Sequence, residues 1–126
     1  MKDELSFGEF IQRKRTEKGF SLREMAKKMK ISAPYLSDIE RGNRNPFNKN
    51  RFNELEQLLL LTKEESICMY DLAGKATNTV PVDIGEYLMA NKYVRDAIRE
   101  AIANNADEEE WTRFVDSLNA GITCTR

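Results

Sequence analysis

Basic side chains are concentrated in the first half of this chain, and the chemistry they offer is the binding of anions. Twelve lysines and arginines lie within residues 12–51 against four acidic residues, so this segment carries a net charge of +8. The remaining residues carry eight basic and seventeen acidic side chains, which brings the whole chain to −1. Lys and Arg gathered in one patch neutralise phosphate groups. The segment is therefore a candidate for contact with the backbone of a nucleic acid.

Catalytic and metal chemistry find little support in the same sequence. The chain contains no histidine, so no Ser/His or Cys/His arrangement can exist. Its two cysteines, Cys68 and Cys124, lack metal-ligand spacing, and we expect Cys68 to pack inside a helical core. The acidic run at residues 107–110 is typical of the first turn of a helix, where the dipole favours negative charge. We therefore expect no enzyme, no metal and no cofactor.

Two short helices are expected to position the basic residues. Ser21 and Glu24 form a capping-box pattern, so the first helix should begin one residue after Ser21. Its apolar residues recur at helical spacing, and its charged residues take the other face. Ser32 can cap a second helix over about residues 33–41, which Gly42 ends in the left-handed conformation. Two capped helices joined by a three-residue turn have the spacing of a helix-turn-helix.

The second of these helices has a polar face that the core does not use. Leu36 and Ile39 are expected to point inward, with Tyr35 partly covered. The residues left facing away from the core are Ala33, Pro34, Ser37, Asp38 and Arg41. These side chains are the ones that could meet DNA.

Three more helices are expected to close the core around this pair. A capping box at Ser6 should begin a helix that Gly19 ends. Another is expected over about residues 49–60, after a loop rich in turn-forming residues. The last should begin from a cap at Thr62 and stop at Gly74.

The rest of the chain is expected to form a different kind of unit. Residues 75–82 have no helical period and contain Pro81, so they are expected to be a linker. Residues 83–126 are expected to hold three short helices capped by Asp83, Asn91 and Asp107, each with one apolar face. So small a unit has too little core to be stable alone. These helices either pack back onto the first domain, or they form a homodimer interface or a groove for a protein partner.

Four short motifs follow one another at fixed spacing in the first part of the chain. They are SLREMA at residues 21–26, Ile31-Ser32, YLSDIERG at residues 35–42, and Arg44-Asn45-Pro46. In this combination residues 7–61 resemble the XRE/Cro-like helix-turn-helix family, the lambda-repressor type of DNA-binding domain. The resemblance implies a five-helix DNA-binding domain, which we place over residues 1–74. With the small helical extension that the residue pattern predicts over residues 83–126, the whole fold is expected to be all-α. The resemblance also implies that the second helix of the motif enters the major groove.

The resemblance further implies roles for single residues. Ala33 and Pro34 would read bases through apolar contact, as with a thymine methyl, and Ser37 through a hydroxyl that donates or accepts. Asp38 either accepts from a cytosine amino group or pairs with a nearby Arg or Lys. Tyr35 either lies against the sugar-phosphate backbone or helps to cover the core. The residues expected to bind phosphates are Ser21, Arg23, Tyr35, Arg41, Asn43, Arg44, Lys49 and Arg51.

These features predict a sequence-specific transcriptional regulator that binds double-stranded DNA as a dimeric repressor. The alternative is an interaction protein, such as an antitoxin or a phage-immunity factor, whose C-terminal helices bind a protein partner. No segment approaches about 20 consecutive apolar residues, and the charged start MKDELS lacks the apolar core of a signal peptide. A cytoplasmic protein with no membrane partner is expected.

Overall fold

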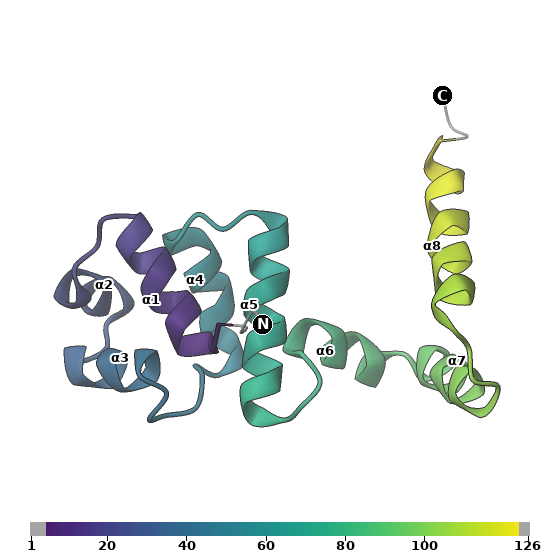
Figure 1. Cartoon of the computed structure of the whole chain (residues 1–126), viewed down its shortest axis with the longest axis horizontal. Coiled ribbons are helices and arrows are strands. Elements are labelled where there is room, and N and C mark those ends of the chain that lie inside the picture. Colours follow the sequence, from purple (N-terminus) through teal and green to yellow (C-terminus); the bar gives the residue numbers. More distant parts are fainter. Residues whose placement is uncertain (1–4, 124–126) are drawn as a thin grey trace. The chain divides into compact units, whose positions relative to one another are not determined.

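The computed structural model describes residues 5–123, and the chain is helical throughout this range (Figure 1). No strand occurs between residues 5 and 123, which confirms the all-α expectation for this part of the chain. No helix in it is both long and apolar enough to cross a membrane. The elements are α1 (Phe7–Glu17), α2 (Leu22–Met29), α3 (Ala33–Glu40), the 3-10 turn η1 (Lys49–Arg51), α4 (Phe52–Leu58), α5 (Lys63–Thr77), α6 (Val82–Ala90), α7 (Lys92–Ala103) and α8 (Glu108–Thr123).

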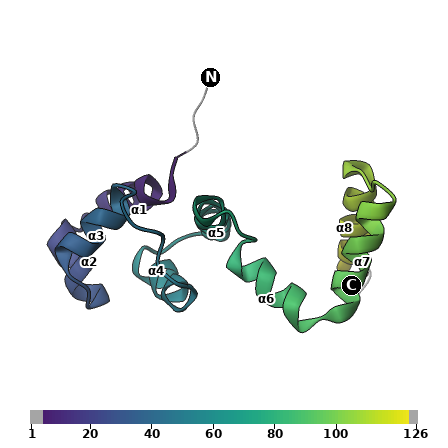
Figure 2. The ribbon, with the colours of Figure 1, turned by 90° about the horizontal axis from the view of Figure 1, so that it is seen from below.

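The chain divides into two compact units, Met1–Gly85 and Glu86–Arg126. The first is built around one apolar core to which α1 to α5 all contribute. In the views of Figures 1 and 2, α3 lies beside α1 and α2, and contacts between these helices agree with that arrangement. Each helix buries one stripe of residues three and four positions apart, as Met25 and Met29 do in α2. The largest fully buried side chains are Ile11, Met25, Met29, Leu36, Ile39, Phe52, Leu55, Leu59 and Met69.

Gly8 lies where α1 meets the C-terminal end of α3. A Cβ atom at this position would collide with the backbone carbonyl oxygens of Ile39 and Glu40. The two helices can approach this closely only because glycine has no side chain. The backbone of α1 therefore fixes the position of the last turn of α3.

Helix α5 is longer than the sequence predicted. It passes through Gly74 and ends at Thr77, with Asn78 in the left-handed conformation at its C-cap (φ 56°). Gly74 is buried, and a Cβ there would lie 2.8 Å from the carbonyl oxygen of Thr79. The glycine is needed because the chain folds back against it, and not because the helix stops. Since α6 begins at Val82, the connection between the two helices is shorter than expected.

Two smaller expectations about this region also need correction. The helix expected over residues 49–60 starts as the turn η1 and ends at Leu58. Cys68 is exposed instead of packed in the core. The reason is that Met69, Leu72 and Ala73 take the buried face of α5, which turns the preceding residue outward. Cys124 lies outside the described residues.

The second unit has well-formed helices but no buried side chain among residues 86–120. Helix α8 begins with the expected capping box, in which Asp107 and Glu110 exchange two hydrogen bonds of 2.9 and 3.0 Å. Asn91 does precede α7, but its side chain donates to the Tyr87 carbonyl and does not cap the helix. Asp83 does not cap α6 from outside, because that helix already begins at Val82. The apolar residues of α7 and α8 that stand exposed are Tyr93, Ile102, Trp111, Phe114, Val115 and Leu118.

Candidate nucleic-acid interface

Side-chain caps set the geometry of the pair α2 and α3. The Ser21 hydroxyl accepts from the Glu24 N–H (3.1 Å), and the Glu24 carboxylate accepts from the Ser21 N–H (2.7 Å). These hydrogen bonds favour the charged carboxylate and so lower the pKa of Glu24. Lys30 ends α2 in the left-handed conformation (φ 59°), and Ser32 caps α3 by accepting from the Tyr35 N–H (3.1 Å). The caps expected at Ser21 and Ser32 are therefore present.

The faces of α3 separate much as the sequence indicated. Leu36 and Ile39 are buried, while Pro34 is exposed. Ala33 is an exception, because it is half-buried and packs against the core. Ser37 and Asp38, the other two residues expected to read bases, are half-buried at the surface. The outward face of α3 is thus open at Pro34 and Arg41 and partly covered between them.

Asp38 is the centre of a charged cluster at the end of α3. Its Oδ1 atom lies 3.0 Å from Nη2 of Arg41, and its Oδ2 atom lies 3.7 Å from Nε of Arg44. The guanidinium of Arg41 also donates to the Ser37 hydroxyl (2.7 Å). Of the two alternatives open for Asp38, pairing with arginine is the one that the protein adopts on its own.

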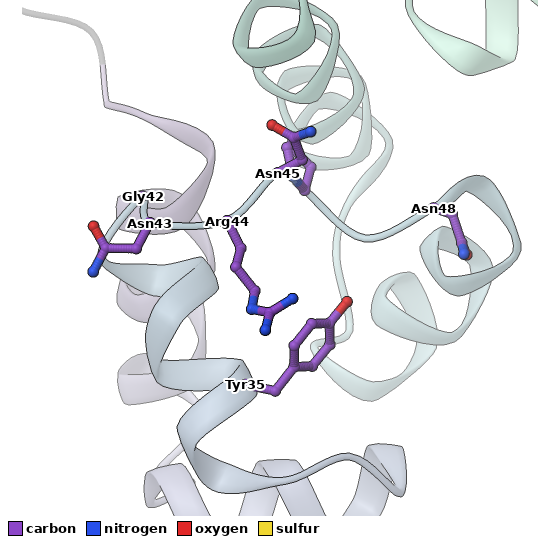
Figure 3. A pocket seen from close by; sticks show the side chains of 7 residues that line it. Tyr35, Gly42, Asn43, Arg44, Asn45 and Asn48 are labelled. Carbon is purple, nitrogen blue, oxygen red and sulfur yellow. The ribbon is translucent and has the colours of Figure 1, made fainter.

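Arg44 stands in the loop after α3 and turns back toward the helix. Its guanidinium lies 5.1 Å from the ring centroid of Tyr35, and Figure 3 shows the two side chains facing each other. The Tyr35 ring in turn meets Phe47 edge to face, with 6.2 Å between centroids. Of the two roles expected for Tyr35, covering the core is present in the structure, and contact with the sugar-phosphate backbone stays a prediction. The contact of its ring with Arg44 was not expected.

The loop borders an open hollow of about 520 Å³ beside α3 (Figure 3). Gly42, with φ 82°, starts the loop in the left-handed conformation. The amide side chains of Asn43, Asn45 and Asn48 stand around the hollow with the Arg44 guanidinium, so its lining is mainly polar. Amide and guanidinium N–H groups are donors that phosphate and base oxygens accept.

A nearly buried ion pair holds the last residue of α3 to α1. Arg15 donates from Nε (2.7 Å) and Nη2 (3.0 Å) to the two carboxylate oxygens of Glu40. The Arg15 side chain is 12% exposed and that of Glu40 is 5% exposed. The hydrogen bonds to Glu40 raise the pKa of Arg15 further above its usual value, although burial opposes this. The last turn of α3 is therefore held to α1 twice, by this pair and by the close approach at Gly8.

The other residues expected to bind phosphates differ in how exposed their side chains are. Arg51 donates from Nη1 to the Met29 carbonyl (2.8 Å) and to Glu54 (2.7 Å), so it already joins the end of α2 to α4. The residues of this set that are exposed are Ser21, Arg23, Arg41, Asn43, Arg44 and Lys49. All of them belong to α2, α3, η1 or the segments that flank these elements.

Sequence reasoning missed the supports beneath this surface. Glu40 was read only as part of a motif, although it is a buried acid bound to Arg15. Arg15 was counted among basic residues of the surface, and Gly8 was not singled out. A charged residue placed among buried neighbours of a helix was the available signal for Glu40. Nothing in the sequence pointed to Gly8.

The helical pair and its basic surroundings define a class of DNA-binding protein. Residues 11–49 match a family model described as helix-turn-helix, which covers α2, α3 and most of α1. Together with the caps and the turn geometry, this match shows that the chain contains a helix-turn-helix domain of the XRE, Cro-like type. Domains of this type bind DNA.

One curated relative carries the same region. The HTH-type transcriptional regulator DdrOP3 of Deinococcus deserti is 39% identical over 64 residues. The aligned region covers 51% of this chain and 44% of the relative, so the chain spans less than half the length of that protein. No solved structure matches the chain significantly.

Proposed function

We propose that this protein is a sequence-specific transcriptional regulator that binds double-stranded DNA as a dimeric repressor. The observation that carries the proposal is the outward surface of α3 and the following loop, which gathers Ser37, Asp38, Arg41 and Arg44 on a helix-turn-helix. The basic charge of residues 12–51 and the similarity to a named transcriptional regulator support it. In this proposal α1 to α5 form the DNA-binding domain, and α6 to α8 form its extension.

The proposed complex places α3 in the major groove. Ala33, Pro34, Ser37 and Asp38 would then lie along the base edges. The N-terminus of α2 offers the Ser21 end of the helix and its unpaired N–H groups to one phosphate. The remaining proposed phosphate contacts are Arg23, Tyr35, Arg41, Asn43, Arg44, Lys49 and Arg51, of which Arg51 contributes least because protein groups already hold its Nη1 atom.

Dimerisation is proposed from the second unit. Tyr93, Trp111 and Phe114 lie on the apolar faces of α7 and α8 and are between 41% and 66% exposed. Exposed apolar patches of this kind often mark an interface with another protein. A two-fold dimer would cover them and would place two copies of α3 about 34 Å apart, one turn of DNA. The operator would then be palindromic.

Selection of duplexes from a random pool by the full-length protein tests this function. An enriched palindrome with half-sites about one turn apart is the expected result. Failure to enrich any sequence at low salt would end the proposal. The affinity of the enriched duplex should then be measured over a range of salt concentrations.

A variant separates phosphate binding from other effects. Arg44→Ala should reduce the slope of log affinity against log salt by about one, because one phosphate contact is lost. Lys63→Ala is the matched control, since it removes an exposed basic residue at the start of α5. Equal slopes for the two variants would place Arg44 outside the interface.

A second candidate function is favoured by the same exposed helices. In it the protein is an antitoxin or phage-immunity factor, and α7 and α8 bind a protein partner in place of a second copy. A chain that ends at Ala90 keeps every residue of the apolar core. If this chain binds the selected duplex as tightly as the full chain but loses a stoichiometric protein partner that the full chain retains, the second candidate is supported. If the full chain forms a dimer that the shorter chain cannot form, the first is supported.

A further inference from the structure

We propose that Asp38 determines specificity by holding Arg41 and Arg44 back from DNA that lacks a hydrogen-bond donor for its carboxylate. The inference rests on the proposed function, because it concerns the same surface. In this proposal Asp38 weakens binding to non-cognate sequences, in addition to contacting a base of the cognate one.

Each carboxylate oxygen of Asp38 lies near an arginine, and Oδ1 also accepts a hydrogen bond from one. Oδ1 takes Arg41 at 3.0 Å, and Oδ2 faces Arg44 at 3.7 Å. The Asp38 carbonyl also accepts the N–H of Asn43 (2.8 Å), which ties the start of the loop to the helix. One acidic side chain therefore organises the two cations nearest to the face of α3.

Each arginine has a second support that does not depend on the acid. Arg41 donates to the Ser37 hydroxyl at 2.7 Å, and Arg44 lies over the Tyr35 ring at 5.1 Å. These contacts keep the guanidinium groups near their positions if the carboxylate lets go. Loss of Asp38 would thus free their charge without scattering the side chains.

The pairs are weak enough to exchange. The side chains of Arg41 and Arg44 are 63% and 57% exposed, and ion pairs at such exposure are screened by water and salt. A DNA phosphate competes well for an arginine because each contact also releases condensed counterions. On contact with DNA the arginines can therefore pass from Asp38 to the phosphates.

That exchange leaves the carboxylate without a partner beside a negative backbone. On most sequences this opposes binding, since a charge that loses its partners near like charges is destabilised. In the major groove the N4 amino group of cytosine is a donor for a carboxylate. A duplex with cytosine at that position satisfies Asp38 best, because the only other major-groove amino donor, on adenine, stands beside the N7 acceptor, which repels a carboxylate, and this difference is specificity.

The test compares Asp38→Asn with Glu64→Gln in the full-length protein. Both variants lose one negative charge in the same unit, but Glu64 lies in the first turn of α5, away from the cluster. Affinities are measured by fluorescence anisotropy for the duplex selected by the wild type and for a random-sequence duplex of equal length. Thermal unfolding of each variant, followed by circular dichroism, shows that it is folded.

Asp38→Asn should bind the random duplex more tightly than the wild type, by up to about eightfold at 0.1 M salt for one added phosphate contact. Glu64→Gln should change that affinity by less than about twofold. The ratio of affinities for the selected and random duplexes should fall about tenfold or more in Asp38→Asn, because base discrimination is lost as well. A repeated selection with this variant should lose a preference for cytosine at one position of each half-site.

The tighter binding of Asp38→Asn to random DNA should also depend on the two arginines. In a protein that already carries Arg41→Gln and Arg44→Gln, adding Asp38→Asn should no longer tighten binding to random DNA. This combination separates release of the two cations from a general change of charge.

Other results would overturn the inference. If Asp38→Asn matches Glu64→Gln on both duplexes, or selects the same half-sites as the wild type, Asp38 has no role in specificity. If Asp38→Asn weakens both duplexes equally, the acid supports the arginines and does not restrain them. Failure of the wild type itself to bind any duplex would instead reject the proposed function, and this inference with it.

Discussion

In the unit that contains α1 to α5, helices are joined to one another, whereas in α7 and α8 the stabilising contacts stay local. The first unit has ion pairs between distant residues, such as Arg15 with Glu40 and Lys14 with Glu65. The ion pairs described in α7 and α8 join residues three or four positions apart within one helix. The same contrast holds for apolar side chains, which are buried in the first unit and not among residues 86–120.

This contrast between the two units shows that well-formed helices do not by themselves make a cooperatively folded unit. Helices of 12 and 16 residues, such as α7 and α8, are marginal in water when no surface covers their apolar stripe. A capping box defines where α8 begins, but a cap adds little cooperativity. We therefore expect substitutions in the first unit to act on the whole fold, and equivalent substitutions in α7 and α8 to act locally.

The largest effect is expected from breaking the ion pair under α3. Glu40→Ala leaves the nearly buried Arg15 without its partner, so the free energy of unfolding should fall by about 3–5 kcal/mol. The measurement is urea unfolding followed by circular dichroism. The matched change in α7 is Asp96→Ala, which breaks an exposed pair with Lys92 and should cost less than about 0.5 kcal/mol. Similar losses in both variants would remove the contrast between the units.

A smaller effect is expected from two helical glycines in different surroundings. Gly8→Ala forces α1 away from the carbonyl groups of Ile39 and Glu40 and should destabilise the protein by about 1–3 kcal/mol. Gly85→Ala meets nothing closer than a Val80 methyl at 3.9 Å, so helix propensity should decide and stability should rise by up to about 1 kcal/mol. Thermal unfolding of both variants shows whether each substitution raises or lowers the stability of the protein. A stabilising Gly8→Ala would contradict the close contact between α1 and α3.

The next comparison is between two capping boxes, each of which contributes about 1 kcal/mol to the stability of its helix. Ser21→Ala removes the cap of α2 and should lower the free energy of global unfolding by about that amount. Asp107→Ala removes the cap of α8 and should leave the main unfolding transition unchanged, while backbone amides at the start of α8 lose protection from hydrogen exchange. If Asp107→Ala shifted the main transition as Ser21→Ala does, α8 would belong to the same cooperative unit.

The smallest expected effect is a change of stability with pH that depends on the carboxylate of Glu65. The hydrogen bond from Lys14, at 2.6 Å, and the backbone N–H of Thr62 lower the pKa of Glu65 below its usual value. A carboxylate with a lowered pKa stabilises the fold above its unfolded value of about 4.3 and stops doing so as the pH falls through its folded value. Glu65→Gln should therefore be less stable than the wild type near pH 7, and the gap should close below about pH 4. A gap that does not shrink at all as the pH falls below the unfolded value would mean that the charge on Glu65 is not its source.

The sequence allowed the local elements to be predicted better than the contacts between them. The caps at Ser6, Ser21, Ser32 and Thr62 and the capping box of α8 were readable because each depends on residues three positions apart. The prediction that α5 ends at Gly74 was wrong, because glycine at this position has another role. Glycine serves both as a helix stop and as a place where another backbone comes close, and only the fold shows which applies.

The candidate site shows the same limit. That Ser37, Asp38 and Arg41 face outward followed from helical periodicity. The capture of Asp38 by Arg41 could be suspected, since the two are three positions apart, but that of Arg44 depends on a loop that returns toward the helix. The pairing of Arg15 with Glu40 joins residues 25 positions apart and required the packing of α1 on α3.

The glycine and ion pair that bind α1 to the end of α3 have a mechanical consequence. Because a backbone contact and a nearly buried salt bridge act on the same turn, the last turn of α3 is held firmly to α1. If α3 enters the major groove, as we propose, a helix held in this way would have little freedom to tilt toward a mismatched groove. Accommodation to a non-ideal operator would then come from the DNA, which bends and twists at a cost that depends on its sequence. Stiffness in the protein would in this manner turn the flexibility of DNA into part of what is recognised.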